Sequence, residues 1–278
     1  MRIAIVGHGS IGRRHFENLV SLGVEAHHVR YRDFDVGILD QVDAVVIATA
    51  TDVRLGLIKH VAERGLPMFI EKPVAFRVDE LLEIECLASG VADRSMVGFM
   101  LRYHPALQKL CSIDVSNVIG FSFDVGYDVE RWRQDWLFSK SYASKPNGGG
   151  VLLDLCHEID MASIIFPDLA LKQVSSIGHR KFPGVDFCSR LTVQTFEGIE
   201  GSISMDYLTP QMHRRIIIYC VDATYDFDFT RQRYEVSTSS TSDLINLPFD
   251  RNAMFLAIMR DWLRLIEGLD ASNHLVPR

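Results

Sequence analysis

Residues 2–12 read RIAIVGHGSIG, and this stretch decides how the first part of the chain folds. The apolar run RIAIV is typical of a buried strand, and Gly7-His8-Gly9-Ser10-Ile11-Gly12 follows it as a G-x-G-x-x-G motif. Residues 13–22 then carry apolar side chains at helical spacing. A glycine motif between a strand and a helix predicts a turn that binds the pyrophosphate of a dinucleotide at the N-terminus of the helix.

Each glycine of the motif has its own role in this prediction. Gly7 permits the tight turn, Gly9 lets the backbone approach the phosphates, and Gly12 lets the helix pack against the strand. The alternative is an ordinary glycine-rich turn that binds no ligand. The position of the motif, directly after a strand and at the start of a helix, favours the dinucleotide.

Short apolar strands and helical stretches alternate through the rest of residues 1–115. We expect strands at 25–30, 44–48, 68–70 and 96–100, and helices at 53–64 and 79–88. Strict alternation of this kind predicts a doubly wound parallel sheet with helices on both faces.

The pattern changes in residues 116–278, where apolar and polar residues alternate one by one. This period of two covers 121–127, 199–207 and 225–229, and helices are expected at 151–165 and 252–266. Alternation predicts a mostly antiparallel sheet that is covered on one face. The expected fold is therefore an α/β domain over 1–115, followed by an α+β domain over 116–278.

The composition is that of a globular protein, with 47% hydrophobic and 23% charged residues. The net charge of −7 gives no electrostatic support for binding nucleic acid. We find no run of about 18 apolar residues that would span a membrane. The five cysteines are scattered, so we expect reduced thiols, no structural zinc and a cytoplasmic protein. Residues 275–278 (LVPR) fit either the remnant of a cleavable tag or a natural ending.

Two arginines determine which dinucleotide we expect. An acidic residue about 20 positions after the motif would bind the ribose 2′-hydroxyl of NAD, but the strand at 25–30 ends in Arg30, with Arg32 nearby. Guanidinium groups suit a 2′-phosphate, so the sequence favours NADP. Under the alternative, both arginines are solvated and Asp33 or a neighbour accepts NAD.

Polar residues also follow two later strands of the first domain. Glu71-Lys72-Pro73 comes after the strand at 68–70, and Arg102 comes after the strand at 96–100. Ligands of open parallel sheets bind outside the carboxyl ends of the strands. Lys72 is therefore a candidate acid/base group, with a plain surface lysine as the alternative. Arg102 is a candidate anchor for an anionic or polyhydroxyl substrate.

Three glycines at 148–150 lead to Asp154, His157 and Asp160, which would share one face of a helix at 151–165. His157 is a candidate second acid/base group because imidazole titrates near neutral pH, and Asp154 would orient its ring. The alternatives are an exposed polar stripe or a metal site. The latter has no evident fourth ligand, so we predict no metal.

Two aromatic residues precede the three glycines. Trp132 and Tyr142 are candidates for a wall of the substrate pocket, where Trp132 would stack on a sugar ring. Packing of the loop onto the sheet is the alternative for Trp132.

The glycine motif, Ala48-Thr49-Ala50, the EKP tripeptide, the three glycines and HEID at 157–160 occur in that order. Together they resemble the glucose–fructose oxidoreductase / inositol dehydrogenase / MocA family over nearly the whole chain. The resemblance implies a Rossmann domain joined to an open-faced sheet domain that often serves oligomerisation, here as a homodimer or homotetramer. It also implies an NAD(P)-dependent oxidoreductase acting on a sugar, cyclitol or sugar nucleotide.

The resemblance further implies an acid/base role for Lys72, cofactor contacts for Glu71 and Ala48-Thr49-Ala50, and a cis bond before Pro73. The chain also departs from the family pattern. Its aspartate stands three residues before His157 rather than four, and Arg54 replaces a common histidine. The C-terminal element that returns to the first domain is expected to be short or missing.

A non-catalytic dinucleotide sensor on the same fold is the alternative function, because a fold alone does not establish chemistry. A sensor would not need Lys72 and His157 together, so their joint presence favours an enzyme. On that interpretation the two side chains meet across a shared cleft.

Overall fold

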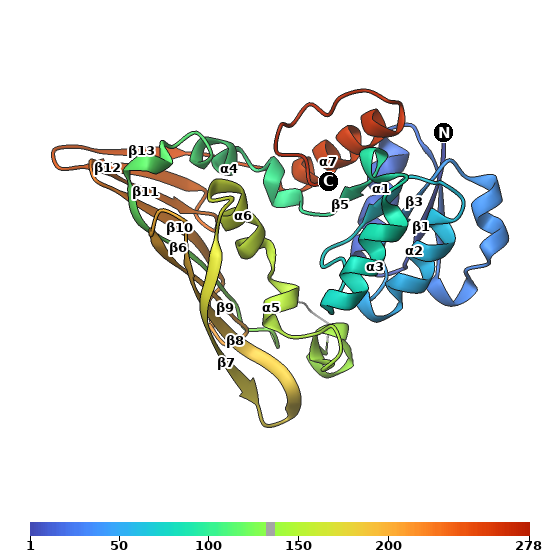
Figure 1. Ribbon diagram of the computed structural model, residues 1–278, viewed down its shortest axis with the longest axis horizontal. Helices are drawn as coiled ribbons and strands as arrows, with labels where there is room; N and C mark the ends of the chain where they lie inside the picture. The colour runs from blue at the N-terminus through green and yellow to red at the C-terminus, as the bar shows by residue number, and fades with distance from the viewer. Residues whose placement is uncertain (132–136) are drawn as a thin grey trace. The chain divides into compact units, whose positions relative to one another are not determined.

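The computed structural model describes residues 1–131 and 137–278, which form two compact units (Figure 1). The parallel-sheet unit comprises Met1–Tyr103 and Asp250–Arg278, and the mixed-sheet unit comprises His104–Phe249. The expected boundary near residue 115 is therefore about twelve residues late, and the expectation that 116–278 forms one domain is wrong for its last part.

The parallel-sheet unit contains five strands in the order β2-β1-β3-β4-β5. They are β1 (Arg2–Val6), β2 (Glu25–Val29), β3 (Ala44–Ile47), β4 (Met68–Ile70) and β5 (Met96–Val97). The helices of this part of the chain are α1 (Ser10–Ser21), α2 (Arg54–Ala62) and α3 (Val78–Ala88). Every strand pair is parallel, which confirms the expected doubly wound sheet.

The core of this unit follows from the apolar strands. Every residue of β3 and β4 is buried, as are the last four of β1, because both faces of a parallel sheet are covered. Apolar residues of α2, such as Leu57 and Val61, join the same core cluster. β5 is shorter than the expected 96–100, since a 3₁₀ turn begins at Met100.

Helix α7 (Arg251–Ile266) belongs to the parallel-sheet unit, not to the second domain as the sequence suggested. Trp262 is fully buried there, and its Nε1 donates a hydrogen bond to the Arg94 carbonyl across 3.2 Å. The Tyr103 hydroxyl donates to Asp261 Oδ2 at 2.9 Å. Helical spacing identified an amphipathic helix, but it carried no information about which sheet the apolar face would cover.

The chain after α7 also packs on this unit, and its described residues 267–278 form no further helix. Val97 N–H donates to the carbonyl of Pro277 across 2.8 Å, so residues 275–278 pack beside β5.

The mixed-sheet unit contains eight strands in the order β13-β12-β11-β10-β6-β9-β8-β7. They are β6 (Val118–Gly126), β7 (Ala170–His179), β8 (Phe182–Gln194), β9 (Glu200–Asp206), β10 (His213–Cys220), β11 (Ala223–Asp228), β12 (Arg233–Thr238) and β13 (Ser242–Asn246). Among the described residues, β6 and β9 are the one parallel pair, and the other neighbours are antiparallel. The mostly antiparallel sheet predicted from period-two alternation is thereby confirmed.

Alternation also separates the two faces of this sheet. Phe121, Phe123 and Val125 of β6 are buried on the covered face, while Ser122 and Asp124 are half-buried on the other. The unit also contains α4 (Pro105–Leu110), α5 (Val151–Asp154) and α6 (His157–Ile165), and α5 and α6 follow the covered face (Figure 1). The single helix expected over 151–165 is wrong, because the chain leaves helical geometry at Leu155.

Candidate functional site

The three glycines of the first turn have different surroundings. Gly7 has φ +125°, and a Cβ there would lie 2.3 Å from the carbonyl oxygen of Ala48. A Cβ on Gly12 would lie 1.9 Å from the carbonyl oxygen of Gly7. A Cβ on Gly9, by contrast, would have no atom within 4 Å. Packing of the turn therefore requires Gly7 and Gly12, whereas Gly9 faces open space.

That open space lies at the N-terminus of α1, where Gly9 is the N-cap residue. Gly9 has no side chain with which to cap the helix, and the first turn of α1 contains no acidic residue. Backbone N–H groups and the helix dipole favour an anion at such a position. The turn therefore fits a pyrophosphate. Ser10 and Ile11 begin the helix, and their predicted cofactor contacts stay predictions.

Two histidines and a phenylalanine stack beside the glycine turn. The exposed ring of His8 lies on that of His28, with centroids 4.1 Å apart, and Phe16 stacks on His28 at 5.3 Å. His28 Nε2 lies 2.9 Å from the carbonyl oxygen of Gly7, so it donates a hydrogen bond that supports the turn. Sequence reasoning missed His28, since nothing in the edge strand β2 distinguishes it from its neighbour His27 or signals this contact.

Arg30 and Arg32 follow β2 directly and are exposed, with 54% and 73% of their side chains accessible. Their Nε atoms lie 3.7 and 3.9 Å from the two oxygens of Asp33. The end of β2 thus presents two guanidinium groups and one carboxylate. This arrangement is compatible with either dinucleotide, so the preference for NADP is not supported by it.

Glu71 is directed into the parallel-sheet unit. Its Oε1 lies 2.6 Å from Nε2 of His15, and both side chains are buried. A Cβ on Gly98 would lie 2.9 Å from this carboxylate, so a glycine leaves room for it. The predicted cofactor contact of Glu71 stays a prediction. His15 was missed, because no local pattern links two polar residues on α1 and after β4.

Lys72 follows Glu71 at the carboxyl end of β4 and is half-buried. The Lys72–Pro73 bond is cis, as the family resemblance implied. The acid/base role of Lys72 stays a prediction.

Arg54 contacts the turns that follow β3 and β4. Its Nε and Nη2 donate to the carbonyl of Thr49 at 3.1 and 2.7 Å. Its Nη1 donates to the carbonyls of Glu71 and Pro73. Thr49 is buried, and the flanking Ala48 and Ala50 are half-buried; their predicted cofactor contacts stay predictions. The sequence had marked Arg54 only as a departure from the family pattern.

Arg102 holds the C-terminal segment of the parallel-sheet unit. Its Nη1 donates to the carbonyl of Leu275 at 3.3 Å, and its guanidinium carbon lies 5.7 Å from the ring centroid of Phe99. Asn273 Nδ2 in turn donates to the Arg102 carbonyl at 3.0 Å. These contacts explain the position of Arg102 without a substrate, and its predicted anchoring role stays a prediction.

Asp154 of the mixed-sheet unit accepts hydrogen bonds from three tyrosines. The hydroxyl of Tyr142 lies 2.5 Å from Oδ1, and those of Tyr207 and Tyr127 lie 2.9 and 3.2 Å from Oδ2. Burial, together with the negative charge of Asp154, raises the pKa of Tyr127 and of Tyr207 well above the ordinary value. Both hydroxyls therefore remain hydrogen-bond donors.

The three glycines at 148–150 bring Asp154 and Tyr142 together. A Cβ on Gly149 would lie 2.4–2.7 Å from three carbonyl oxygens of the turn at 142–145. Gly150 has φ +92°, and a Cβ there would lie 1.9 Å from Oδ1 of Asp186. The other oxygen of Asp186 accepts from the backbone N–H of Leu152 at 3.0 Å. Only glycines let α5 begin this close to both neighbours.

His157 begins α6 and is 4% exposed, and Glu158 and Asp160 are also buried. Burial rules out the alternative of an exposed polar stripe. Because the chain breaks helical geometry between Asp154 and His157, the predicted shared helical face applies only to His157 and Asp160. Glu158 Oε1 pairs with Nε of Arg214 at 2.6 Å, which links α6 to β10. The predicted site residue Trp132 lies outside the described residues.

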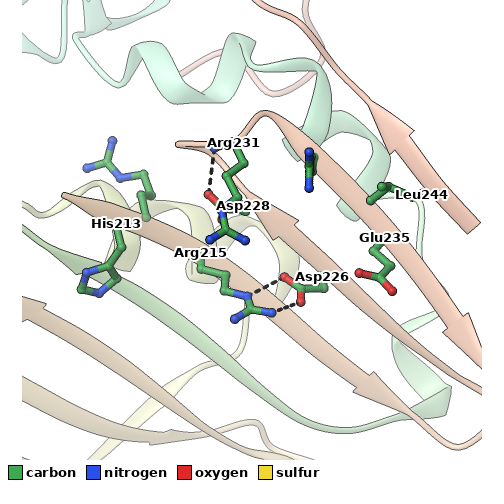
Figure 2. A pocket seen from close by; sticks show the side chains of 9 residues that line it. His213, Arg215, Asp226, Asp228, Arg231, Glu235 and Leu244 are labelled. Atoms are coloured by element: carbon green, nitrogen blue, oxygen red, sulfur yellow. Dashed lines mark hydrogen bonds and ion pairs between the residues drawn. The ribbon is translucent and has the colours of Figure 1, made fainter. Parts of the chain in front are cut away.

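A separate pocket of about 400 Å³ lies on β10, β11, β12 and β13, on the open face of the mixed sheet (Figure 2). Arg215 pairs there with Asp226, and Arg231 lies 3.6 Å from Asp228. The pocket is lined mostly by charged side chains of both signs, together with His213 and Leu244, and contains none of the predicted site residues.

Within the described ranges, 1–131 and 137–278, no group of three or more His, Cys, Asp or Glu side chains could hold a metal ion. In the same ranges, no helix combines the length and apolar character needed to cross a membrane.

Comparison with known proteins adds family information to this geometry. A family model described as an oxidoreductase family with an NAD-binding Rossmann fold matches residues 20–99. The chain is 26% identical over 186 residues to the uncharacterized oxidoreductase YrbE of Bacillus subtilis, covering 58% of this chain and 52% of that protein. The chain thus spans about half the length of this curated relative.

Two solved structures share the fold over nearly the whole chain. One is UDP-N-acetylglucosamine 3-dehydrogenase GnnA from Acidithiobacillus ferrooxidans, with a TM-score of 0.79, 17% identity and coverage of 96% of this chain and 89% of that one. The other is levoglucosan dehydrogenase in complex with NADH and L-sorbose, with a TM-score of 0.80, 16% identity and coverage of 99% and 92%. At these identities the likeness concerns the fold alone.

Proposed function

We propose that this chain, which belongs to the Gfo/Idh/MocA oxidoreductase family, is a nicotinamide-dinucleotide-dependent dehydrogenase or reductase. Its substrate would carry a hydroxyl or carbonyl group on a sugar, cyclitol or sugar nucleotide. The observation that carries the proposal is the glycine turn, where Gly9 faces open space at the N-terminus of α1. A glycine turn open to the solvent beside a helix N-terminus is what a dinucleotide pyrophosphate requires.

When bound, a nicotinamide dinucleotide supplies or accepts the hydride. Gly9 and the N-terminus of α1 bind its pyrophosphate, and the turns after β3 and β4 receive its nicotinamide half. Lys72, at the carboxyl end of β4, gives a proton to the substrate oxygen in reduction and takes it back in oxidation.

His157 is the second acid/base group in this proposal, and its buried position at the start of α6 holds its ring in place. Asp154 organises the site through hydrogen bonds. It accepts a hydrogen bond from the hydroxyl of Tyr142, and this bond links the turn at 142–145 to α5. Tyr142 is 41% exposed and is therefore able to contact a substrate.

The choice of dinucleotide rests on Arg30 and Arg32. We infer that their guanidinium groups bind the 2′-phosphate of NADP, because no carboxylate occupies the end of β2 itself. The neighbour solved with NADH argues for the other choice, and Asp33, within 4 Å of both arginines, is the group that would accept the ribose of NAD.

Sugar-like substrates are proposed because the named activities of the structural neighbours concern a sugar nucleotide and an anhydrosugar. We also infer a homodimer or homotetramer formed through the open face of the mixed sheet. Paired charges such as Arg215 and Asp226 on that face are able to match the same charges of a second copy (Figure 2). Light scattering after size-exclusion chromatography tests the oligomer, and a monomer would contradict it.

Turnover assays test the enzyme. Oxidation of NADPH or NADH is followed with a panel of keto-sugars, and reduction of NADP or NAD with UDP-N-acetylglucosamine, levoglucosan and inositols. We expect at least one substrate to react, and Lys72→Ala and His157→Asn each to lower kcat by about 100-fold or more, since acid–base catalysis contributes that much.

Lys59→Ala, at an exposed position on α2, is the matched control and should leave kcat unchanged. Dinucleotide binding without turnover on any substrate would favour a sensor. Full turnover in Lys72→Ala would remove Lys72 from the mechanism.

A further inference from the structure

We infer that Arg54 is a positioning residue that fixes the turn carrying Lys72 to the end of β3. The inference rests on the proposed function, because there Lys72 is an acid/base group. Arg54 begins α2, and the turns that it contacts follow β3 and β4, which are neighbouring parallel strands. A single side chain at this point can therefore reach both turns.

The hydrogen bonds of Arg54 account for four of the five N–H groups of a guanidinium. Two of them converge on the carbonyl of Thr49, at 3.1 and 2.7 Å. The other two come from Nη1 and bind the carbonyls of Glu71 and Pro73. These two carbonyls belong to the residues on either side of Lys72, so the backbone is held both before and after the lysine.

Burial raises the energetic cost of losing these hydrogen bonds. Arg54 is 4% exposed, and Glu71 and Thr49 are buried as well, so water is poorly placed to replace a lost donor. A buried carbonyl left without its donor is costly. The planar guanidinium serves three carbonyls at once. A lysine at this position offers a single nitrogen, which cannot reproduce the fork.

The expected consequence is that the turns after β3 and β4 hold a fixed position relative to each other at this edge of the sheet. With Thr49 tied to Glu71 and Pro73, the Cα of Lys72 keeps one position, and its amine extends from a fixed base. Without Arg54, the Lys72 turn would sample other arrangements. A catalytic group that is loosely held reacts more slowly even when binding is unchanged.

Hydrogen exchange measured by mass spectrometry tests the contact without any substrate. Arg54→Met and Arg54→Lys are compared with the native chain and with Arg64→Met. Arg64 donates to His60 and Asp40 just beyond α2, so it is a matched arginine away from both turns. We expect roughly ten- to hundred-fold faster exchange in peptides covering 49–53 and 70–76 of both Arg54 variants.

In the Arg64→Met control these peptides should exchange as in the native chain. Native exchange rates in a folded Arg54→Met chain would overturn the inference. Native rates in Arg54→Lys would overturn the role of the fork. Faster exchange across all of β1, β3 and α1 would assign Arg54 to general stability instead.

Kinetics test whether Arg54 acts through Lys72. In Arg54→Lys we expect kcat to fall about tenfold or more, while NADPH or NADH affinity by fluorescence titration stays within about twofold. Adding Arg54→Lys to Lys72→Ala should cause no further loss of kcat. A full additional loss would overturn the inference. If the native protein turns over no substrate, the proposed function fails, and the exchange experiment still decides whether Arg54 holds the Lys72 turn.

Discussion

His15 Nε2 lies 2.6 Å from Glu71 Oε1 inside the parallel-sheet unit, where both side chains are buried. The ring of His15 is also packed edge-on against Phe69 and Phe255. This contact ties α1, which follows the glycine turn, to the residue immediately before Lys72. The helix that follows the glycine motif is therefore held against the EKP tripeptide by a direct side-chain contact.

Removing His15 would leave a carboxylate buried with one partner fewer. We expect His15→Ala to lower the free energy of unfolding by about 1–3 kcal/mol, the usual cost of leaving a buried hydrogen-bonding group without its partner. Glu71→Gln keeps the shape of the side chain and one hydrogen bond, so the decrease in the free energy of unfolding should be much smaller. Urea unfolding measures both. Equal losses would mean that charge at Glu71 contributes as much as the contact itself.

The surroundings of Gly9 and Gly12 predict opposite outcomes for the same substitution. Gly9→Ala should fold normally, because its Cβ meets nothing within 4 Å, but it should weaken dinucleotide binding by filling the space of the phosphates. Gly12→Ala should destabilise the unit itself, since its Cβ would lie 1.9 Å from a carbonyl oxygen. Thermal unfolding and NADPH titration separate the two. A Gly9→Ala chain that binds as the native one does would place the pyrophosphate elsewhere.

Arg30→Ala tests the choice of cofactor. If Arg30 binds a 2′-phosphate, NADPH affinity should fall by about tenfold or more, as for the loss of a charge-assisted hydrogen bond, while NADH affinity changes little. Fluorescence titration with both dinucleotides measures this, and Arg233→Ala in the mixed-sheet unit is the control. Tighter binding of NADH than of NADPH by the native protein would show that the arginine argument is wrong.

Removing the hydroxyl of one or the other of two tyrosines that donate to Asp154 should have different effects: one substitution should lower stability and the other should lower activity. Tyr207 is buried, so Tyr207→Phe should cost about 1–3 kcal/mol of unfolding free energy by removing a donor from a buried carboxylate. Tyr142 is 41% exposed, and water can replace its hydroxyl. Tyr142→Phe should therefore affect stability little but lower turnover. Unchanged turnover in Tyr142→Phe would remove it from the substrate site.

His104 gives the mixed-sheet unit a dependence on acid. Burial among Phe227, Phe229 and Phe249, and to a lesser extent the charge of Arg214, lowers the pKa of His104 to about 4. Its Nδ1 accepts a hydrogen bond from Ala106 N–H at 3.1 Å, which requires the neutral ring. Between the unfolded pKa of about 6.5 and the folded value, the unfolded chain binds the extra proton.

Stability should therefore be highest above pH 6.5 and decrease as the pH falls towards 4, by up to about 3 kcal/mol from this group. His104→Asn keeps a helix-capping acceptor but does not titrate in this range. Urea unfolding from pH 7 to pH 4 should show a shallower loss in the variant. Parallel curves would mean that other groups cause the acid sensitivity.

Much of the parallel-sheet unit was predictable because its signals are local. The strand at 2–6, the glycine turn and the helix after it are adjacent in sequence, so period and motif were sufficient. The position of α7 was not predictable, because its contacts with Arg94 and Tyr103 join residues more than 150 positions apart. Periodicity reports that a helix has an apolar face, not what the face covers.

The candidate site divides in the same way. Gly9, Lys72 and Asp154 stand in recognisable motifs and were found. Their supports, such as His15 and Tyr127, are ordinary residues in ordinary elements, and only the folded chain brings them near the motifs. The break after Asp154 was also missed, because VLLDLCHEID has a continuous helical pattern, and the turn at 155–156 depends on tertiary packing.

The parallel-sheet unit is built from two segments that are far apart in the sequence, so a truncation that removes either segment should disrupt the unit. A fragment ending near residue 115 would contain the whole dinucleotide motif but would lack Trp262 and Phe255, which fill its interior. Such a fragment should aggregate and be poorly soluble. Supplying residues 250–278 as a separate peptide should repair it, and cleavage of the native chain near residue 104 should leave the pieces associated.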